Sequence, residues 1–478
     1  MKLYYFTFMI ISFIIIIMLG YFNELTKIFT ISTTMPTSRK LTSYARHINL
    51  KHNFIDRYPS LLECNLKKYP KLSIYDLNNY GNLTEIHSHE APKWTYNMRI
   101  TRGLIINFPI ESLNVFRLEF KWLYRSWIEM QKSESKYWRT DLIVFISKNN
   151  YHLKDDDFFL YKLNCSFSKR RKSRLDKPMC ILIDYEPLKN RKNIQKLNIT
   201  FYNHDKLFQK YLTNSNILNL DERKFTRFYS LIRTQLSSYK YVDSILIAFD
   251  GYKYFKSAGY DFLIRSDIDV FLTPYFGKWL PAYCNNFYVG RGRYSTIFNL
   301  NRLNRVARNI NFKTASISNL GSTWYSGVDQ IRLISYLTLL SMCILSVEEF
   351  TSLEKSGRLG VKSWPQWHYG VLSLYGQSLV MNHLIKSKQM NIIKLDNQLD
   401  YPSHSNISID NIIAIHAYHT GRLFSKYELK LGKYDKFEGK DFNFNAVKYY
   451  SLKMALEAKF LSNFELEHML KIELIKKI

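Results

Sequence analysis

Two aspartates in the middle of the chain are the residues best placed to do chemistry. The stretch Tyr260–Pro274 reads YDFLIRSDIDVFLTP, with an apolar run before the acids and another after them. This pattern predicts a buried strand that carries Asp267 and Asp269 at its end. Residues two apart on an extended strand point to the same side, so both carboxylates can reach one point. Two such carboxylates repel each other, and a hard divalent cation such as Mn²⁺ or Mg²⁺ relieves that repulsion.

An Asp-x-Asp pair also arises by chance, but the flanking residues here match a known pattern. The stretch resembles the metal-binding strand of GT-A-type glycosyltransferases, which is commonly introduced by Tyr-Asp and an apolar triplet. The resemblance implies that Asp267 and Asp269 hold Mn²⁺ or Mg²⁺ against the diphosphate of a nucleotide sugar, with Arg265 among the donor-binding groups. The segments RSDIDVF and HAYH also resemble an uncharacterised invertebrate family of membrane-anchored proteins. That second resemblance implies no activity.

A second group of candidate ligands lies near the C-terminus. Three isoleucines within residues 412–415 predict a short buried strand, with His416 at its end and His419 just past it. A neutral imidazole is a good ligand for Mn²⁺, so one of the two is expected to complete the site, and the sequence does not select which. GT-A enzymes often carry such a histidine, followed by Gly and a basic residue that meets the diphosphate. The resemblance implies this role for Lys426, although Phe-Ser-Lys replaces the Lys-Pro-Trp ending of several families.

Other side chains are candidates for binding the donor, the sugar and the acceptor. Arg291 and Arg293 lie beside glycines whose backbone can approach a ligand closely, although a turn with incidental basic residues fits equally well. Aromatic rings pack against the C–H faces of sugars, and the same rings also occur in ordinary packed turns. The aromatic and imidazole candidates are Trp324, Tyr325, Trp364, Trp367 and His368.

An inverting transfer needs a carboxylate as catalytic base. The candidates are Asp329, Glu348 and Glu349, and their spacing does not select among them.

The apolar patterns predict the elements that position these residues. A strand at 100–108, a helix after Ser112 and a strand at 141–147 form a β-α-β unit, whose parallel strands are buried on both faces. Further patterns predict a strand at 179–183, a helix at 225–255 that is broken near Ser237, and an apolar core helix at 331–345. The expected fold class is α/β, with a GT-A-like, mixed and mainly parallel sheet flanked by helices. This order of elements matches the GT-A pattern.

The apolar sequence near the N-terminus predicts a membrane anchor. Residues 3–22 carry no charge and are long enough to span a bilayer, so 1–22 is expected to be a cytosolic stub and transmembrane signal anchor. Residues 23–98 are expected to form a stem, 99–435 the GT-A-like catalytic domain and 436–478 a helical extension. Four glycosylation sequons favour a lumenal body and a single-pass type II protein of the Golgi or endoplasmic reticulum. They begin at Asn82, Asn164, Asn198 and Asn406.

Cysteine content and charge limit the remaining possibilities. Five cysteines are too few for a disulfide scaffold; Cys165 and Cys180 could pair in an oxidising lumen, or all five could be small buried hydrophobes. The formal charge of +28 favours anionic partners, but a lumenal body rarely meets nucleic acid, and none is expected as a partner. The expected function is metal-dependent transfer of a sugar from a nucleotide-diphosphate donor to a glycan or glycoprotein. The alternative is an inactive, membrane-anchored glycan-binding protein with the same fold.

Overall fold

A computed structural model of the 478-residue chain describes its structure from the first predicted strand onward. The described residues are 99–109, 112–147, 159–167, 177–191, 222–281, 286–315, 317–356, 367–419, 424–437 and 443–476. The predicted anchor at 3–22 and stem at 23–98 lie outside them.

The predicted β-α-β unit is confirmed. Strand β1 (Ile100–Asn107) and strand β2 (Trp138–Ile146) are parallel and joined by helix α6 (Leu113–Gln131). All of β2 is buried, which explains why its second half, Leu142–Ile146, is apolar without alternation. Ser112 precedes α6 as expected, but its side chain makes no capping hydrogen bond.

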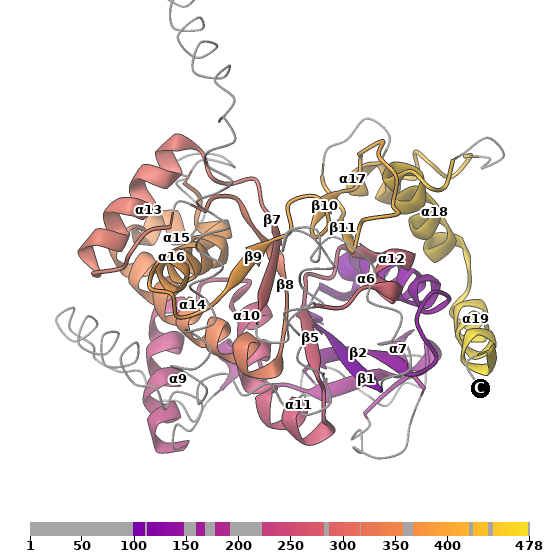
Figure 1. Cartoon of the computed structure of the whole chain (residues 1–478), viewed down its shortest axis with the longest axis horizontal. Coiled ribbons are helices and arrows are strands. Elements are labelled where there is room, and N and C mark those ends of the chain that lie inside the picture. The colour runs from indigo at the N-terminus through magenta and orange to yellow at the C-terminus, as the bar shows by residue number, and fades with distance from the viewer. Residues whose placement is uncertain are drawn as a thin grey trace, which may run out of the picture. The chain divides into compact units, whose positions relative to one another are not determined.

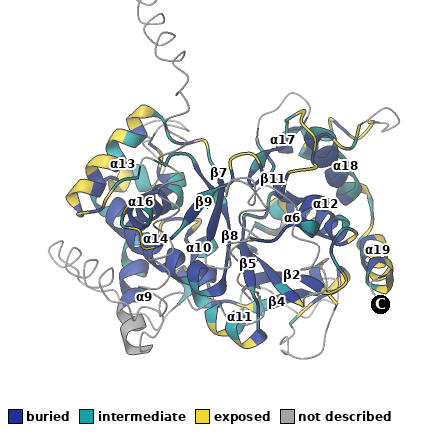
Figure 2. Ribbon diagram, viewed as in Figure 1, coloured by how far each residue is buried: buried dark blue, intermediate teal, exposed yellow. Residues whose placement is uncertain are grey.

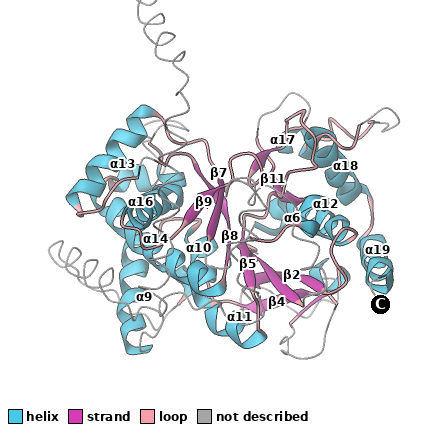
Figure 3. Cartoon of the chain, viewed as in Figure 1, coloured by secondary structure: helices cyan, strands magenta, loops and turns pink. Residues whose placement is uncertain are grey.

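The large sheet has eight strands in the order β3-β4-β2-β1-β5-β8-β7-β9 (Figures 1 and 3). The first five strands of this order, β3, β4, β2, β1 and β5, are all parallel to one another. Strand β8 runs antiparallel to both of its neighbours, and β9 is parallel to β7. The structure therefore confirms a mixed α/β fold with a mostly parallel central sheet. The remaining strands of this sheet are β3 (Cys165–Ser166), β4 (Cys180–Asp184), β5 (Phe262–Arg265), β7 (Phe287–Arg291), β8 (Leu320–Ser326) and β9 (Ile392–Lys394).

Helices cover both faces of the large sheet, and most of the sheet is buried between them (Figure 2). A separate hydrophobic cluster lies on each face. Alternate residues of one strand enter different clusters: Leu104 and Ile106 of β1 pack on the α6 face, and Ile105 packs on the other. The α6 face also contains α12 (Pro274–Lys278), α17 (Lys426–Lys430), α18 (Val447–Phe460) and α19 (Asn463–Lys476). The second face contains α9 (Glu222–Leu236), α10 (Val242–Asp250), α11 (Tyr252–Ala258), α13 (Ile297–Asn309), α14 (Val328–Glu348) and α16 (Leu372–Lys386).

The long helix predicted at 225–255 is interrupted as expected, because residues 237–241 separate α9 from α10. Of the described helices, α14 is the one long and apolar enough to cross a membrane. Most of α14 is buried inside the protein, which is typical of a core helix and agrees with the prediction at 331–345. The short connecting elements are α7 (Phe159–Lys162), η3 (Leu188–Asn190), α15 (Ser352–Lys355) and η6 (Tyr369–Val371).

A second, three-stranded sheet lies beside the large one. It consists of β10 (Tyr401–Pro402), β11 (Ala414–His416) and β6 (Val270–Leu272), with β11 in the middle. Strand β11 runs antiparallel to β6, and His416 is the pairing partner of Val270. This register brings the C-terminal part of the chain to the Asp-x-Asp segment.

The C-terminal helices pack on the same core as the β-α-β unit. Leu452 and Met454 of α18 belong to the cluster on the α6 face. Arg125 of α6 forms an ion pair of 2.7 Å with Glu457 of α18, and Lys121 donates to the Leu461 carbonyl. The extension predicted at 436–478 therefore shares its core with the domain that precedes it.

Cys165 and Cys180 form a disulfide that joins the neighbouring strands β3 and β4. Of the two alternatives, the structure therefore confirms pairing. Both cysteines are buried and belong to the cluster on the α6 face.

We expect this disulfide to stabilise the protein by about 3 kcal/mol, the usual value for a closed loop of this length. Replacing both cysteines, as in C165S/C180S, should lower the free energy of unfolding by that amount, measured by urea denaturation. The wild type should lose the same amount in reductant, whereas the double variant should not respond. A wild type that unfolds identically with and without reductant would contradict the bridge.

Candidate metal centre

Asp267 and Asp269 lie where the chain leaves the large sheet and enters the small one. Strand β5 ends at Arg265 and strand β6 begins at Val270, so both acids belong to the connection between the two sheets. The expectation of one continuous strand with the acids at its end is thus corrected to two short strands with the acids between them. The consequence for the site is that two sheets position the carboxylates.

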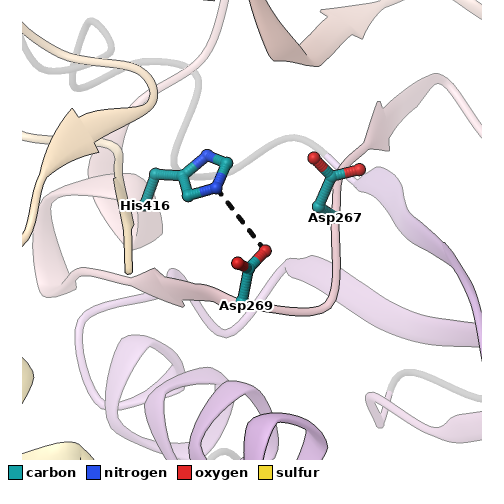
Figure 4. A group of neighbouring side chains, drawn as sticks. All are labelled: Asp267, Asp269 and His416. Carbon is teal, nitrogen blue, oxygen red and sulfur yellow. Dashed lines mark ion pairs between the residues drawn. The ribbon is translucent and has the colours of Figure 1, made fainter. Parts of the chain in front are cut away.

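His416 completes a group of three possible metal ligands (Figure 4). One oxygen from each of Asp267 and Asp269 and one ring nitrogen of His416 all lie within 4.8 Å of one another. Ligand atoms on one ion at about 2.1 Å lie at most about 4.2 Å apart, so a small inward shift would let all three bind the same cation. Two carboxylates and an imidazole suit several divalent metals, and the group could therefore hold a metal ion. We call these three residues the candidate metal centre.

Positive groups compensate the charge of Asp269. The Lys426 ammonium lies 2.8 Å from Asp269 Oδ2, and His416 Nε2 lies 3.6 Å from Asp269 Oδ1. Burial alone would raise the pKa of the Asp269 carboxyl, but His416 and Lys426 hold that pKa well below its ordinary value. Lys426, predicted as a phosphate-binding residue, is thus brought directly to the candidate metal centre. Its ammonium also lies 3.8 Å from Glu119 of α6.

The ring of His416 lies between two acids. Its Nδ1 is 3.5 Å from Asp400 Oδ1, on the other side of the ring from the Nε2 that faces Asp269. Burial alone would lower the pKa of His416, but Asp269 and Asp400 together raise the pKa well above its ordinary value. In the absence of a metal the imidazole therefore favours its protonated, positive form.

His419 is not part of the candidate metal centre. It is exposed, and its ring stacks on Tyr427 with 4.9 Å between the ring centroids. Partial desolvation of the ring by its neighbours, followed by the Lys426 charge, lowers the pKa of His419. Of the two histidines left open by the sequence, the structure places His416 with the acids.

The predicted arginines differ in their surroundings. Arg265 is buried and donates to the carbonyls of Ser244 and Ser322 and, at 3.1 Å, to Asp267 Oδ1. Its donors are thus used inside the protein, where they orient Asp267. Arg293 lies over the Tyr418 ring at 4.8 Å, and that ring makes an edge contact with His416. Arg291 ends β7 and its backbone amide donates to the Leu399 carbonyl.

Several residues expected to contact sugar are in the core instead. Trp324 and Tyr325 belong to β8, which is paired on both sides, and neither side chain is exposed. Trp367 is also fully buried, stacked on Tyr375 at 4.4 Å. The expectation that these three rings bind sugar is wrong, because the sheet and its helices cover them. His368 is exposed and accepts a hydrogen bond from the Gly370 amide; Trp364 lies outside the described residues.

The structure separates Asp329, one of the predicted catalytic acids, from the candidate metal centre. Asp329 follows the end of β8 that pairs with the start of β5, whereas Asp267 follows the end of β5, so the two acids lie at opposite edges of the sheet. Asp329 instead accepts hydrogen bonds from Tyr252 and Lys256 of α11. Glu349 pairs with two arginines of α13, and Glu348 is the last residue of α14. The expectation that Asp329 serves the site as a base is therefore corrected, and a catalytic role for Glu348 or Glu349 stays a prediction.

The structure describes two of the four sequon asparagines. Asn164 and Asn406 are both exposed, as a glycan would require. Asn82 and Asn198 lie outside the described residues. Glycosylation of the chain stays a prediction.

Two buried acids near the centre were not found from the sequence. Asp400 faces His416, and Glu119 forms ion pairs with Lys426 and, at 2.6 Å, with Lys430. Each is a single acid in an ordinary stretch of sequence, one on a helix and one just before β10, and no spacing relates them to the Asp-x-Asp segment. Only the fold brings them together.

Fold and site together define the class: an α/β protein with a candidate metal centre at the junction of a large and a small sheet. The chain belongs to the family described as a domain of unknown function (DUF7164), whose model matches residues 96–478. The matched region begins just before β1 and includes α18 and α19. A search of the curated proteins found no match.

We expect Mn²⁺ to bind more tightly as pH rises. His416 must lose its proton to become a ligand, and its raised pKa means that this loss begins above the ordinary value of about 6.5. The Mn²⁺ affinity, measured by calorimetry, should increase by up to about tenfold per pH unit until that pKa is passed. H416Q should bind weakly with little pH dependence, and H419Q should keep the wild-type slope. A wild-type affinity that does not change with pH would contradict the role of His416.

We also expect Lys426→Met to increase Mn²⁺ affinity. The Lys426 ammonium holds Asp269 in the metal-free protein, so its removal frees that carboxylate for a cation. The gain should be about fivefold, corresponding to roughly 1 kcal/mol for a partly buried ion pair. K433M is the matched control, because Lys433 pairs with Glu428 rather than with Asp269. A loss of Mn²⁺ affinity in K426M would show that Lys426 supports the site in another way.

Proposed function

We propose that this protein is a metal-dependent glycosyltransferase of the GT-A type, moving a sugar from a nucleotide-diphosphate donor to a glycan or glycoprotein acceptor. The observation that carries the proposal is the convergence of Asp267, Asp269 and His416, with Lys426 on Asp269. These ligands come from two distant parts of the chain and meet beyond the carboxyl end of β5. The carboxyl ends of parallel strands are the usual ligand site of such sheets.

The residues of the centre fit the chemistry of a diphosphate leaving group. Asp267, Asp269 and His416 would hold Mn²⁺ or Mg²⁺, and the bound cation would supply charge neutralisation for the departing nucleoside diphosphate. Lys426 would then exchange its contact with Asp269 for a phosphate oxygen, because a cation on that carboxylate competes with the ammonium. Arg265 keeps Asp267 oriented throughout, since the donors that face Asp267 and the neighbouring carbonyls are buried.

Several observations support a secretory location. The disulfide between Cys165 and Cys180 is of the kind that persists in an oxidising compartment. Exposed sequon asparagines at 164 and 406 are compatible with glycosylation in a lumen. With residues 3–22 as the anchor, the proposed topology is a single-pass type II protein of the Golgi or endoplasmic reticulum, with the catalytic body lumenal.

A second candidate is the inactive, membrane-anchored glycan-binding protein. One observation favours it: of the acids predicted as a base, Asp329 lies at the other end of β5 from the candidate metal centre, and Glu349 is paired with Arg302 and Arg305. The two candidates share a fold and differ in whether donor turnover depends on Asp267 and Asp269.

Incubation of the purified full-length protein with Mn²⁺ and a panel of nucleotide sugars tests the proposal. At least one donor should release nucleoside diphosphate, and D267A and D269A should each lower the rate by about 100-fold or more, because each removes a ligand of the cation. D396N is the matched control, since Asp396 is exposed and pairs with Lys394. Turnover that survives both alanine changes would sink the transferase assignment, and glycan binding unaffected by them, without turnover, would favour the binding protein.

A further inference from the structure

Asp400 is a buried acid placed next to the candidate metal centre. It is the residue before β10 and its side chain is inaccessible to solvent. Its Oδ1 lies 3.5 Å from His416 Nδ1, while Nε2 of the same ring faces Asp269. One shift of about 0.5 Å would bring the Nδ1 contact into the usual hydrogen-bond range of about 3.0 Å. Each ring nitrogen of His416 therefore has a carboxylate oxygen within 3.6 Å.

The large sheet provides a niche for the Asp400 carboxylate. A Cβ atom added at Gly290 or Gly321 would collide with Asp400 Oδ2, so β7 and β8 lack side chains where the carboxylate fits. The backbone amide of Thr323 donates to Asp400 Oδ2 at 2.8 Å, and the Thr323 hydroxyl donates to Oδ1 at 2.5 Å. Asp400 itself has φ of 56°, a left-handed conformation that Asp and Asn tolerate better than other side chains.

The same carboxylate is connected to the Asp-x-Asp segment. The Thr323 hydroxyl lies 3.0 Å from the Ser266 hydroxyl, and Ser266 directly precedes Asp267. On the other side, β10 pairs with β11, which places Pro402 opposite His416. Asp400 is thus linked through Thr323 to the segment that carries the acids and adjoins the strand that carries the imidazole.

We propose that Asp400 is a positioning residue that fixes the tautomer of His416, accepting a hydrogen bond from Nδ1–H so that the Nε2 lone pair faces the metal. A neutral imidazole carries one N–H, and the group bonded to one nitrogen decides which nitrogen is free. Carboxylates in this position orient metal-binding histidines in many proteins. The proposal rests on the metal centre assigned above and adds to it the group that selects its ligand atom.

Asp400→Asn tests the proposal because the niche dictates how the amide lies. The Thr323 backbone amide is a donor, so the asparagine oxygen must take the Oδ2 place and its NH₂ group must face His416 Nδ1. The neutral ring must then carry its proton on Nε2, where the metal would bind. The Mn²⁺ affinity of the full-length protein, measured by calorimetry, should fall by about 10- to 100-fold. Asn keeps the size and tolerates the positive φ.

The tautomer is measured directly by ¹⁵N chemical shifts of His416 in metal-free protein at alkaline pH, where the ring is neutral. The wild type should carry the proton on Nδ1 and D400N on Nε2. D396N makes the same change of charge at an exposed site, and we expect it to keep both the affinity and the shifts of the wild type.

The outcomes separate this proposal from the one on which it rests. A wild type that binds no Mn²⁺ would remove the metal centre itself. A wild type that binds Mn²⁺ while its neutral His416 carries the proton on Nε2 would overturn the positioning role alone. This comparison needs no variant. The positioning role would also be overturned if D400N folds and matches the wild type in both affinity and shifts.

Discussion

Electrostatic repulsion between two carboxylates at the junction of two sheets is the constraint on which the rest of the site depends. Asp267 and Asp269 are separated by one residue, and Asp269 is largely shielded from water. A buried carboxylate is costly unless positive charge or hydrogen bonds compensate it. Lys426 and His416 provide that compensation in the metal-free protein, and Arg265 does so for Asp267. A bound cation would meet the same need with shorter contacts.

The fold supplies this compensation through the small sheet. Strand β6 continues the chain just after the acids, and β11 pairs with it from the C-terminal part of the chain. Pairing fixes His416 opposite Val270, and the segment that follows carries Lys426 back to Asp269. The large sheet fixes the other side, because β5 is held between β1 and β8. The backbone hydrogen bonds of the two sheets therefore fix the positions of Asp267, Asp269 and His416.

Sequence patterns predicted the framework well. Strands β1 and β2, helix α6, the interrupted helices α9 and α10 and the core helix α14 all follow from local apolar periodicity, because burial on one or both faces leaves a direct mark on neighbouring residues. The Asp-x-Asp segment and the second group around His416 were also visible, and the pairing of Cys165 with Cys180 was one of two alternatives that the sequence left open. What periodicity missed was the break of the acidic strand into β5 and β6, because either a long strand or two short ones fit the same apolar runs.

The sequence by itself determined which residue types are available: two acids, two histidines, a lysine and many aromatic rings. The tertiary structure alone decided their use. The register of β11 on β6 places His416, rather than His419, with the two acids. Strand pairing buries Trp324 and Tyr325, and the fold brings Asp400 to the imidazole. The physical reason is that side-chain burial follows local pattern, whereas a contact between distant segments depends on strand register and sheet order, which no short stretch of sequence records.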